Sequence, residues 1–316
     1  MKTGVSTRTP SRSDASAGRD YVLNGHSAIA PALSSGLHLV ATPIGNLRDI
    51  TLRALEVLAA ADLIACEDTR VTRKLLDHYG ITTPLTPYHD HNAAEARPKL
   101  IARLEAGDAV ALVSDAGTPL ISDPGYKLVQ AAREAGVSVS ALPGASAVLT
   151  ALAVGALPTD RFLFEGFLPA KEAARRSRIG ELKRTPVTLV LFESGARIAA
   201  ALADLAAGLG AREAAVCREL TKLHEEVRRG DLAALARTYA EGAETRGEFV
   251  IVIGPPQATA GEPADIDVML RQALARLSVK EAVAEIADIT GAPRREVYQR
   301  ALALTKSLEV EREHER

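Results

Sequence analysis

The sequence contains no tryptophan, and aromatic residues make up only 3% of its 316 positions. Proteins that bind single strands of nucleic acid stack successive bases on aromatic side chains. A stacking platform for several bases is therefore not expected in this chain. Phe164, Phe167 and Tyr88 are candidates to hold, at most, one base that has left its stack.

Cysteine is also scarce, and no long apolar run is present. Cys66 and Cys217 each lie in an apolar, strand-like segment without CxxC or Cys/His spacing. This pattern disfavours a disulfide framework or a zinc site and indicates two small core residues in a reducing, cytoplasmic setting, with no metal. The apolar stretch 148–158 is too short to cross a bilayer, which requires about 20 helical residues. We therefore expect no membrane association.

Charge of one sign is not in excess, because 38 basic residues oppose 40 acidic ones and the net charge is −2. The whole molecule offers no attraction to phosphate, so any nucleic-acid binding must come from local patches. One such patch, 171–184, carries six basic residues against two acidic ones: Lys171, Arg175, Arg176, Arg178, Lys183 and Arg184. Charge count alone favours a solvated helix face over a phosphate site.

The first 36 residues are rich in Ser, Thr, Ala, Gly and Arg and show no periodicity. This composition predicts a disordered N-terminal extension over 1–36. A transit peptide is the alternative, but Asp14 and Asp20 interrupt its acid-poor pattern.

From residue 37 onward, strand and helix patterns alternate, as in a parallel sheet built from βαβ units. The expected strands are 37–42, 61–67, 109–114 and 137–142, and the expected helices are 51–60, 69–78, 92–106, 124–135 and 145–153. We assign 37–157 to an N-terminal α/β domain.

A second α/β domain is expected over 158–257. The Phe-rich segment 159–169 breaks the alternation and is interpreted as an interdomain crossover. The expected strands are then 186–192, 213–220 and 247–254, with helices near 195–207 and 231–240. Pro255 and Pro256 end this domain, since neither residue donates to a sheet.

Residues 264–316 are expected to form a helical, helix-turn-helix-like tail. Its helices are predicted at 265–277, 279–289 and 293–304, with Ser278 capping the second and Pro293 opening the third. Such tails are often packing elements only. A second interpretation is that the tail contacts RNA, because it carries several basic residues: Lys280, Arg294, Arg295, Arg300 and Lys306.

Three loops rich in Gly and Pro follow strands of the first expected sheet: 42–47, 114–119 and 143–146. Gly permits close approach and Pro removes a competing donor, so the loops suit a ligand bound by backbone groups. Neither GxxxxGK[ST] nor GxGxxG occurs, which disfavours phosphate cradling. A nucleoside with an amino acid moiety fits better, with Asp115 accepting a hydrogen bond. Any one of these loops alone is explained as an ordinary turn between strand and helix. Three such loops at the same edge of a sheet favour a ligand-binding site.

Eight longer strings follow one another in chain order over roughly 37–304. They are Pro43-Ile44-Gly45-Asn46-Leu47, Glu67-Asp68-Thr69-Arg70, His89-Asp90-His91-Asn92, Ser114-Asp115-Ala116-Gly117-Thr118-Pro119, Asp123-Pro124-Gly125, Pro143-Gly144, Glu165-Gly166-Phe167-Leu168-Pro169-Ala170-Lys171 and Arg218-Glu219-Leu220-Thr221-Lys222. These blocks resemble the signature blocks of the ribosomal RNA small subunit methyltransferase I family. That family belongs to the tetrapyrrole methylase-like, class III methyltransferases.

The resemblance implies two α/β domains with S-adenosyl-L-methionine in the cleft between them, and a homodimer. It also implies 2′-O-methylation of a cytidine in the decoding region of 16S ribosomal RNA, within the small ribosomal subunit. The cofactor residues it implies are Pro43, Gly45, Ser114, Asp115, Ala116, Gly117, Thr118, Pro143, Gly144, Ser146, Phe167 and Leu168. The family assigns no role to 1–36.

Methyl transfer to a ribose hydroxyl is an in-line displacement that needs positioning and benefits from a group drawing off the proton. Lys171, His89 and Glu67 are candidate catalytic residues within these blocks. Each has a structural alternative. His89 is equally a hydrogen-bonded loop residue, Glu67 lies where a helix starts near Asp68, and Lys171 suits a phosphate contact.

Two other functions remain open at this point. The same cofactor architecture serves small-molecule methylation of a tetrapyrrole, although that leaves the basic stretch and the tail unexplained. A non-catalytic RNA-binding or ribosome-assembly protein, in which the glycine loops are only turns, is the other.

Overall fold

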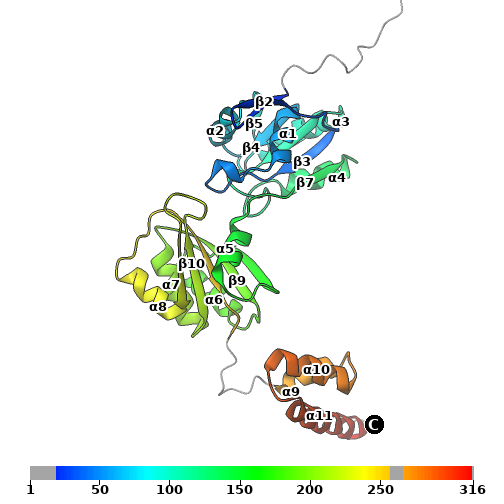
Figure 1. Ribbon diagram of the computed structural model, residues 1–316. Helices are drawn as coiled ribbons and strands as arrows, with labels where there is room; N and C mark the ends of the chain where they lie inside the picture. Colours follow the sequence, from blue (N-terminus) through cyan, green and yellow to red (C-terminus); the bar gives the residue numbers. More distant parts are fainter. Residues whose placement is uncertain (1–18, 257–265, 315–316) are drawn as a thin grey trace, which may run out of the picture. The chain divides into compact units, whose positions relative to one another are not determined.

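The computed structural model describes residues 19–256 and 266–314 and, within the last helix, side chains only as far as Thr305 (Figure 1). The chain divides into two compact units, Met1–Pro255 and Pro256–Arg316. The first unit contains two five-stranded sheets, and the second is helical.

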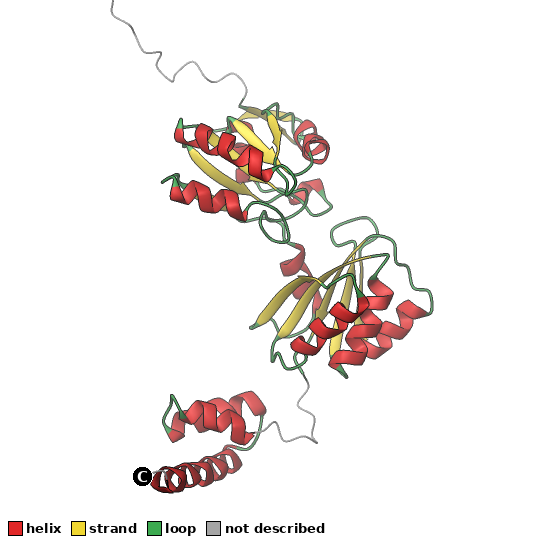
Figure 2. Ribbon diagram, turned by 180° about the vertical axis from the view of Figure 1, so that it is seen from behind, coloured by secondary structure: helices red, strands yellow, loops and turns green. Residues whose placement is uncertain are grey.

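The first sheet is parallel throughout, with strand order β5-β4-β6-β3-β7. Its strands are β3 (Gly36–Val40), β4 (Leu63–Cys66), β5 (Leu85–Pro87), β6 (Ala109–Val113) and β7 (Val139–Leu142). The central strand β6 is buried along its whole length, which explains its uninterrupted apolar sequence. The connecting helices are α1 (Leu52–Ala60), α2 (Thr69–His78), α3 (Ala93–Glu105) and α4 (Tyr126–Glu134), seen around the sheet in Figure 2. The parallel βαβ arrangement confirms the expectation from the sequence.

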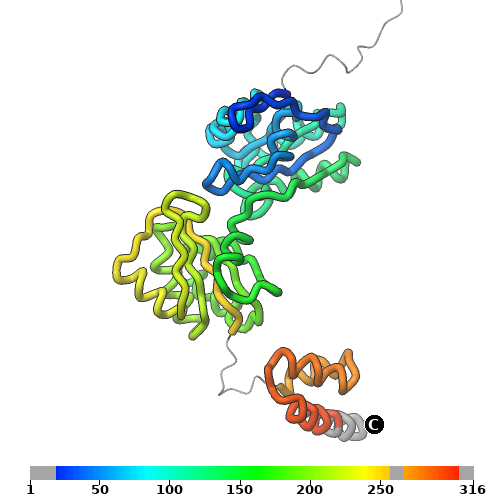
Figure 3. The backbone as a smooth tube through the Cα atoms, in the orientation of Figure 1, coloured from blue at the N-terminus to red at the C-terminus, as the bar shows by residue number. Residues whose placement is uncertain are grey.

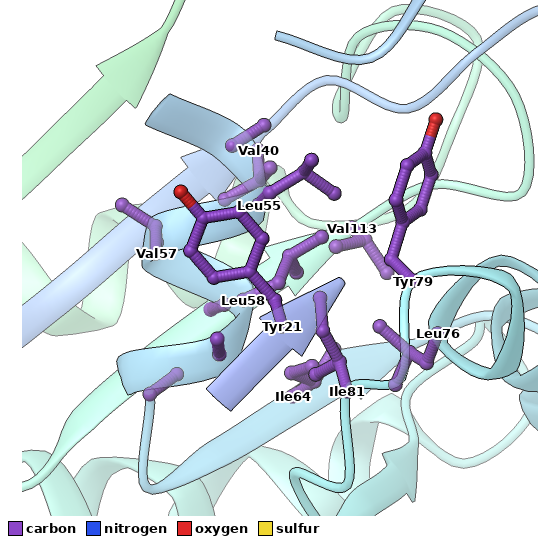
Figure 4. Close-up of a cluster of buried hydrophobic side chains, with 14 of the residues drawn as sticks. Tyr21, Val40, Leu55, Val57, Leu58, Ile64, Leu76, Tyr79, Ile81 and Val113 are labelled. Carbon is purple, nitrogen blue, oxygen red and sulfur yellow. The ribbon is translucent and has the colours of Figure 1, made fainter. Parts of the chain in front are cut away.

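A short hairpin, β1 (Asp20–Leu23) and β2 (His26–Ile29), precedes this sheet. Asn24 and Gly25 both have positive φ, 51° and 80°, as a two-residue hairpin turn requires. Tyr21 packs into the core beside Leu58 and Tyr79 (Figure 4). The prediction of disorder is therefore wrong for this hairpin, whose Asn24-Gly25 turn is typical of a two-residue hairpin loop. Residues 1–18 lie outside the described part.

The second sheet is mixed, with strand order β11-β10-β12-β9-β8. Its strands are β8 (Phe162–Phe167), β9 (Thr188–Ser194), β10 (Glu213–Arg218), β11 (Glu226–Asp231) and β12 (Glu248–Ile253). The helices α6 (Glu172–Leu182), α7 (Ile198–Leu209) and α8 (Leu232–Ala240) bury their apolar residues with this sheet in one core.

The segment expected to be a crossover is instead the edge strand β8, which pairs in parallel with β9. The pattern was hard to read because the register shifts between Phe164 and Gly166. Such a bulge interrupts the simple alternation of inward and outward side chains.

Helix α5 (Ala147–Gly155) also differs from expectation. The sequence assigned it to the first α/β domain, but Val148, Ala151 and Leu152 are buried with residues of β9, β10 and β12. Figure 3 shows the chain passing from β7 into this helix. Because α5 is apolar over most of its surface, it needs cover beyond what the first sheet provides.

The second unit comprises α9 (Ile266–Leu274), α10 (Val279–Thr290) and α11 (Arg294–His314). The three helices enclose their own core around Leu270, Ile286 and Val297. Ser278 and Glu281 form a capping box at the start of α10, as the sequence suggested for Ser278. The third helix continues to His314, past the predicted end at 304. Across the described ranges, we find no helix with the length and apolar content that a membrane span requires.

Candidate functional site

The three Gly/Pro loops meet at the carboxyl edge of the first sheet. Thr42 and Gly117 exchange both backbone hydrogen bonds, at N–O distances of 2.9 and 3.0 Å. The Thr118 hydroxyl donates to the carbonyl of Ala145 at 3.3 Å, which ties the second loop to the third. The convergence expected from the carboxyl ends of parallel strands is thus present.

Much of the backbone in these loops is used to hold them together. The Ser114 carbonyl accepts from the Thr42 hydroxyl at 2.9 Å, and the Ser114 hydroxyl donates to the carbonyl of Gly117 at 3.0 Å. Gly117 has φ of 84°, a conformation that glycine adopts without strain. Ser114 and the main chain of Gly117 therefore build the site's frame.

The second sheet contributes an opposing set of side chains. Since β12 runs antiparallel to both β9 and β10, its amino end lies beside the carboxyl ends of those two strands. This arrangement places Glu193, Glu219 and Glu248 at the same end of the sheet, where β9 and β10 finish and β12 begins.

A cavity of about 320 Å³ lies between these two edges. Its size is in the range of small-molecule sites. The residues that line it are Ile44, Ala116, Gly117, Thr118, Ile121, Ser122, Asp123, Ser146, Ala147, Val148, Phe167, Phe192, Glu193, Ser194, Cys217, Glu219, Leu220, Lys222, Gly247, Glu248, Phe249 and Val250.

The structure brings together some of the residues that were predicted to bind the cofactor. Ala116, Gly117, Thr118, Ser146 and Phe167 line the cavity. The others do not: Pro43, Gly45, Ser114, Asp115, Pro143, Gly144 and Leu168.

Two of the non-lining glycines make close contacts instead. A Cβ on Gly144 would lie 2.7 Å from the Cβ of Ala41, and one on Gly45 would lie 2.4 Å from Cγ of Lys222. Gly45 therefore permits the first loop to pack against the loop that carries Lys222.

Several charged side chains of the second sheet line the cavity, and the sequence did not predict them as pocket residues. Lys222 Nζ bonds Glu219 at 2.7 Å and Glu248 at 2.6 Å. Burial opposes ionisation of Glu219, but hydrogen bonds to Lys222 and to the Glu248 N–H outweigh it and lower its pKa. Glu193 is buried, accepts from the Ser194 N–H at 2.8 Å and lies 3.2 Å from Arg197. With Asp123, the lining therefore includes four carboxylates and one lysine.

Asp123 belongs to a group of carboxylates at the ends of β4 and β6. Burial raises its pKa to about 6, and the nearby charges of Glu67 and Asp115 add to the rise, while the Ser114 hydroxyl offsets part of it. Burial also raises the pKa of Glu67, with further contributions from Asp115 and Asp90. Asp115 itself accepts the Asp68 N–H at 3.0 Å.

None of the three candidate catalytic residues lines the cavity. Glu67 lies among the carboxylates just described. The His89 backbone N–H donates to Asn92 at 2.9 Å in the loop before α3, and Lys171 is an exposed residue directly before α6. Asp68 caps α2 by accepting from the Arg70 N–H at 2.8 Å, as the capping interpretation held. Catalytic roles for Lys171, His89 and Glu67 stay predictions.

Three of the six basic residues in the stretch 171–184 form ion pairs. The buried Arg175 pairs with Asp204 at 2.6 Å, and Arg176 also contacts Asp204, at 2.8 Å. Arg178 binds Glu165 through two hydrogen bonds of 2.6 and 2.8 Å. These ion pairs hold α6 in place and engage three of the charges that the sequence offered for phosphate.

The one cysteine in the lining, Cys217, is held neutral. Burial raises the pKa of its thiol to about 11, so the thiolate is negligible near neutral pH. Since the thiolate is the nucleophilic form, Cys217 does not compete with an acceptor for an alkyl group.

Comparison with known proteins identifies the class. A family model described as "Tetrapyrrole (Corrin/Porphyrin) Methylases" matches residues 36–236, and one described as "RsmI C-terminal HTH domain" matches 260–305. Among solved structures, cobalt precorrin-4 methyltransferase aligns with a TM-score of 0.51 at 19% identity, over 69% of this chain and 94% of that one. Diphthine synthase aligns with a TM-score of 0.52 at 18% identity, over 69% and 89%. The fold is that of a class III methyltransferase, as expected.

Sequence relatives are far closer. Proteins named "Ribosomal RNA small subunit methyltransferase I" from Mesorhizobium japonicum and Erythrobacter litoralis are 54% and 50% identical, over 87% and 88% of this chain and 94% and 99% of their own lengths. A protein of the same name from Escherichia coli O157:H7 is 46% identical over 84% of this chain and 94% of its own. The chain therefore belongs to the tetrapyrrole methylase family and, within it, to the ribosomal RNA small subunit methyltransferase I group.

The protein is thus an enzyme that uses S-adenosylmethionine, and the non-catalytic alternative is set aside. The cavity fits that cofactor chemically. S-adenosylmethionine carries a sulfonium, an ammonium and a carboxylate, and the lining includes four carboxylates and one lysine. Apolar surface from Ile44, Val148 and Phe192 suits the adenine ring.

Proposed function

We propose that this enzyme methylates the 2′-hydroxyl of a cytidine in 16S ribosomal RNA, with the small ribosomal subunit as its substrate and the cytoplasm as its location. The observation that carries the proposal is the shared name of its relatives, which are 46–54% identical over most of the chain. The helix-turn-helix match at 260–305 supports a nucleic-acid partner.

We place S-adenosylmethionine in the 320 Å³ cavity. When bound, it supplies an electrophilic methyl group. The loop residues Ala116, Gly117, Thr118 and Ser146 form one wall around it, and the carboxylates of the second sheet form the other. The apolar lining excludes water, which strengthens these electrostatic interactions.

Labelled S-adenosylmethionine and small subunits from cells lacking this gene provide the test. Label on the ribose of one cytidine of 16S RNA is the expected result. Label on a base, or none, contradicts the proposal. Uroporphyrinogen III offered in parallel separates the tetrapyrrole alternative, which predicts methylation of that compound and not of RNA.

We also propose that the enzyme is a homodimer, as the resemblance implies. Light scattering of the full chain should give about twice the monomer mass of 33.4 kDa. A monomer at micromolar concentration would contradict this.

A further inference from the structure

Leu223 has the most exposed side chain among the large apolar residues that the structure describes, at 92%. It lies in the loop between β10 and β11, directly after Lys222, which lines the cavity. Leu220, at the start of the same loop, is buried and also lines the cavity. Single exposed apolar residues are common on protein surfaces, so exposure alone assigns no role. A role for Leu223 therefore depends on how the loop holds it and on what lies nearby.

Hydrogen bonds within the loop hold Leu223 in one position. The Thr221 N–H donates to the Glu225 carboxylate at 2.6 Å, and the Glu225 N–H donates to the carbonyl of Lys222 at 3.2 Å. Glu219 and Thr221 have φ of 50° and 65°, although neither is glycine. Such backbone strain persists only where the surrounding structure fixes it. Leu223 is therefore displayed on a rigid tip, and a partner that binds it needs little further ordering of the loop.

The same loop lies against the first Gly/Pro loop, 42–47. A Cβ on Gly45 would lie 2.4 Å from Cγ of Lys222 and 3.0 Å from the hydroxyl oxygen of Thr221. Two residues after Gly45, Leu47 is 38% exposed, and the next residue, Arg48, is exposed as well. The edge of the cavity thus offers apolar surface together with a cation. This combination suits a partner that carries both phosphates and apolar base faces.

A nucleotide must leave its base stack to be methylated in this cavity. The cavity of about 320 Å³ lies between the loops of the two sheets, so an acceptor ribose reaches a methyl donor bound there only after its base is unstacked. Proteins that unstack bases compensate for the lost stacking by inserting an apolar side chain, leucine among them, between the neighbouring bases. With no tryptophan and 3% aromatic residues, the chain has few rings for this purpose. A rigid, exposed leucine beside the cavity has the required properties.

We propose that Leu223 is a positioning residue that inserts into the RNA base stack at the point where the acceptor nucleotide leaves it. This inference rests on the proposed function. The side chain fills the gap only when the nucleotide is extruded, so it stabilises the extruded state and not the initial complex. Leu223 thereby raises the fraction of bound RNA whose ribose hydroxyl lies in the cavity.

Single-turnover methylation of small subunits from cells lacking this gene tests this role, with the Kd for subunits measured separately in the presence of S-adenosylhomocysteine. Leu223→Ala should lower the rate at saturating enzyme by about tenfold, as expected for the loss of one apolar contact of this size. The Kd should stay within about threefold, because the initial complex is unchanged. Leu223→Met and Leu223→Phe should retain most of the rate, since both side chains serve as apolar wedges. Leu223→Asn, which is polar and of similar size, should lose as much as Leu223→Ala.

Ile29→Ala is the matched control, because Ile29 is also a highly exposed apolar residue, at 72%, and lies in the β1–β2 hairpin outside the cavity lining. It should keep the wild-type rate. Leu223→Ala itself should bind S-adenosylhomocysteine as the wild type does and should unfold within about 2 °C of the wild type, as is usual for substitutions at exposed positions.

Each other outcome overturns a specific statement. A wild-type rate in Leu223→Ala, or equal losses in Leu223→Ala and Leu223→Phe, removes the insertion role. A raised Kd with an unchanged saturating rate makes Leu223 an ordinary surface contact. A change from dimer to monomer in Leu223→Ala, seen by light scattering, places Leu223 in a contact between protomers instead. These three results leave the proposed function intact, whereas a wild type that labels no ribose overturns that function and the inference with it.

Discussion

The two walls of the pocket are built by different means. The first-sheet wall consists of loops whose backbone groups bond one another, as at Thr42 and Gly117. The second-sheet wall consists of strand ends that carry paired charges, as at Lys222 and Glu219. One wall is thus fixed by main-chain geometry and the other by electrostatics.

Because of this difference, we expect the two walls to respond differently to substitutions. A backbone wall tolerates changes of charge but not added atoms, whereas a charged wall tolerates modest changes of shape but not loss of a partner. The contrast is not absolute. Gly195, which directly follows β9, leaves no room for a side chain in the charged wall, and Asp123 brings a carboxyl group to the backbone wall. Substitutions at these and neighbouring positions therefore test the contrast between the two walls most directly.

The largest effect is expected from Gly195→Ala in the second wall. The new Cβ would lie 1.8 Å from the backbone oxygen of Thr245, which cannot move without shifting the loop before β12. We expect a loss of about 3 kcal/mol or more in unfolding free energy, measured by urea denaturation. Gly180→Ala, exposed in α6 with open space around it, is the control and should stabilise by up to about 1 kcal/mol. Equal stabilities would show that the second wall can adjust to added atoms.

The next effect is the pH dependence of stability at Asp123. Its pKa of about 6 lies above the usual 3.8, so the folded state binds the proton more tightly than the unfolded state does. Stability should therefore fall as pH rises from about 4 through 6. Asp123→Asn should be more stable than the wild type by about 2 kcal/mol at pH 8, and the difference should vanish near pH 4. Thermal unfolding across this range measures it, and a constant difference would contradict the burial of the charge.

A smaller effect is expected when the lysine of the charged wall is neutralised. Lys222→Met leaves Glu219 and Glu248 without their shared cation. The more negative wall should favour S-adenosylmethionine, which has a charged sulfur, over S-adenosylhomocysteine, which does not. We expect the ratio of their affinities to rise by about threefold to tenfold at low salt, as determined by calorimetry. An unchanged ratio would mean that the charges of this wall do not reach the sulfur.

The smallest effect is expected from Asp115→Asn. The amide oxygen still accepts the Asp68 N–H, so the loop is kept while one negative charge is lost. Because Asp115 contributes to the raised pKa of Asp123, that pKa should move down. The midpoint of the pH-dependent stability change reports this, and an upward shift would be inconsistent with repulsion between the two carboxylates.

The sequence was sufficient for the parallel sheet, for the helical tail and for the backbone wall, because these depend on local patterns. The run from Ala109 to Val113 predicts a buried strand, and Gly and Pro at 114–119 predict the loop after it. The charged wall gave a weaker signal, because Glu219 and Lys222 stand in one of the blocks that carry the resemblance but no local pattern places them in a pocket. Glu193 and Lys222 are ordinary surface residue types, and only the antiparallel register of β12 brings them together.

In the basic stretch, the sequence suggested a possible binding site where the structure shows ion pairs within the protein. Charge count at 171–184 left phosphate binding as an alternative, but Asp204, about 30 residues further along the chain, pairs with Arg175 and Arg176. Long-range partners of this kind leave no local signal. Similarly, β8 was concealed by its bulge at Phe164 and Gly166.

Helix α5 has a consequence for how the larger unit unfolds. Its N-cap Ser146 lines the pocket, while Val148 and Leu152 pack with β9, β10 and β12. The second sheet therefore cannot melt without exposing the apolar face of a helix whose amino end is tied to the first sheet's loops through Thr118 and Ala145. Ligand occupancy at one end of the helix should then be felt throughout residues 19–255, as slower amide exchange on both sides and a single calorimetric peak that shifts upward as a whole.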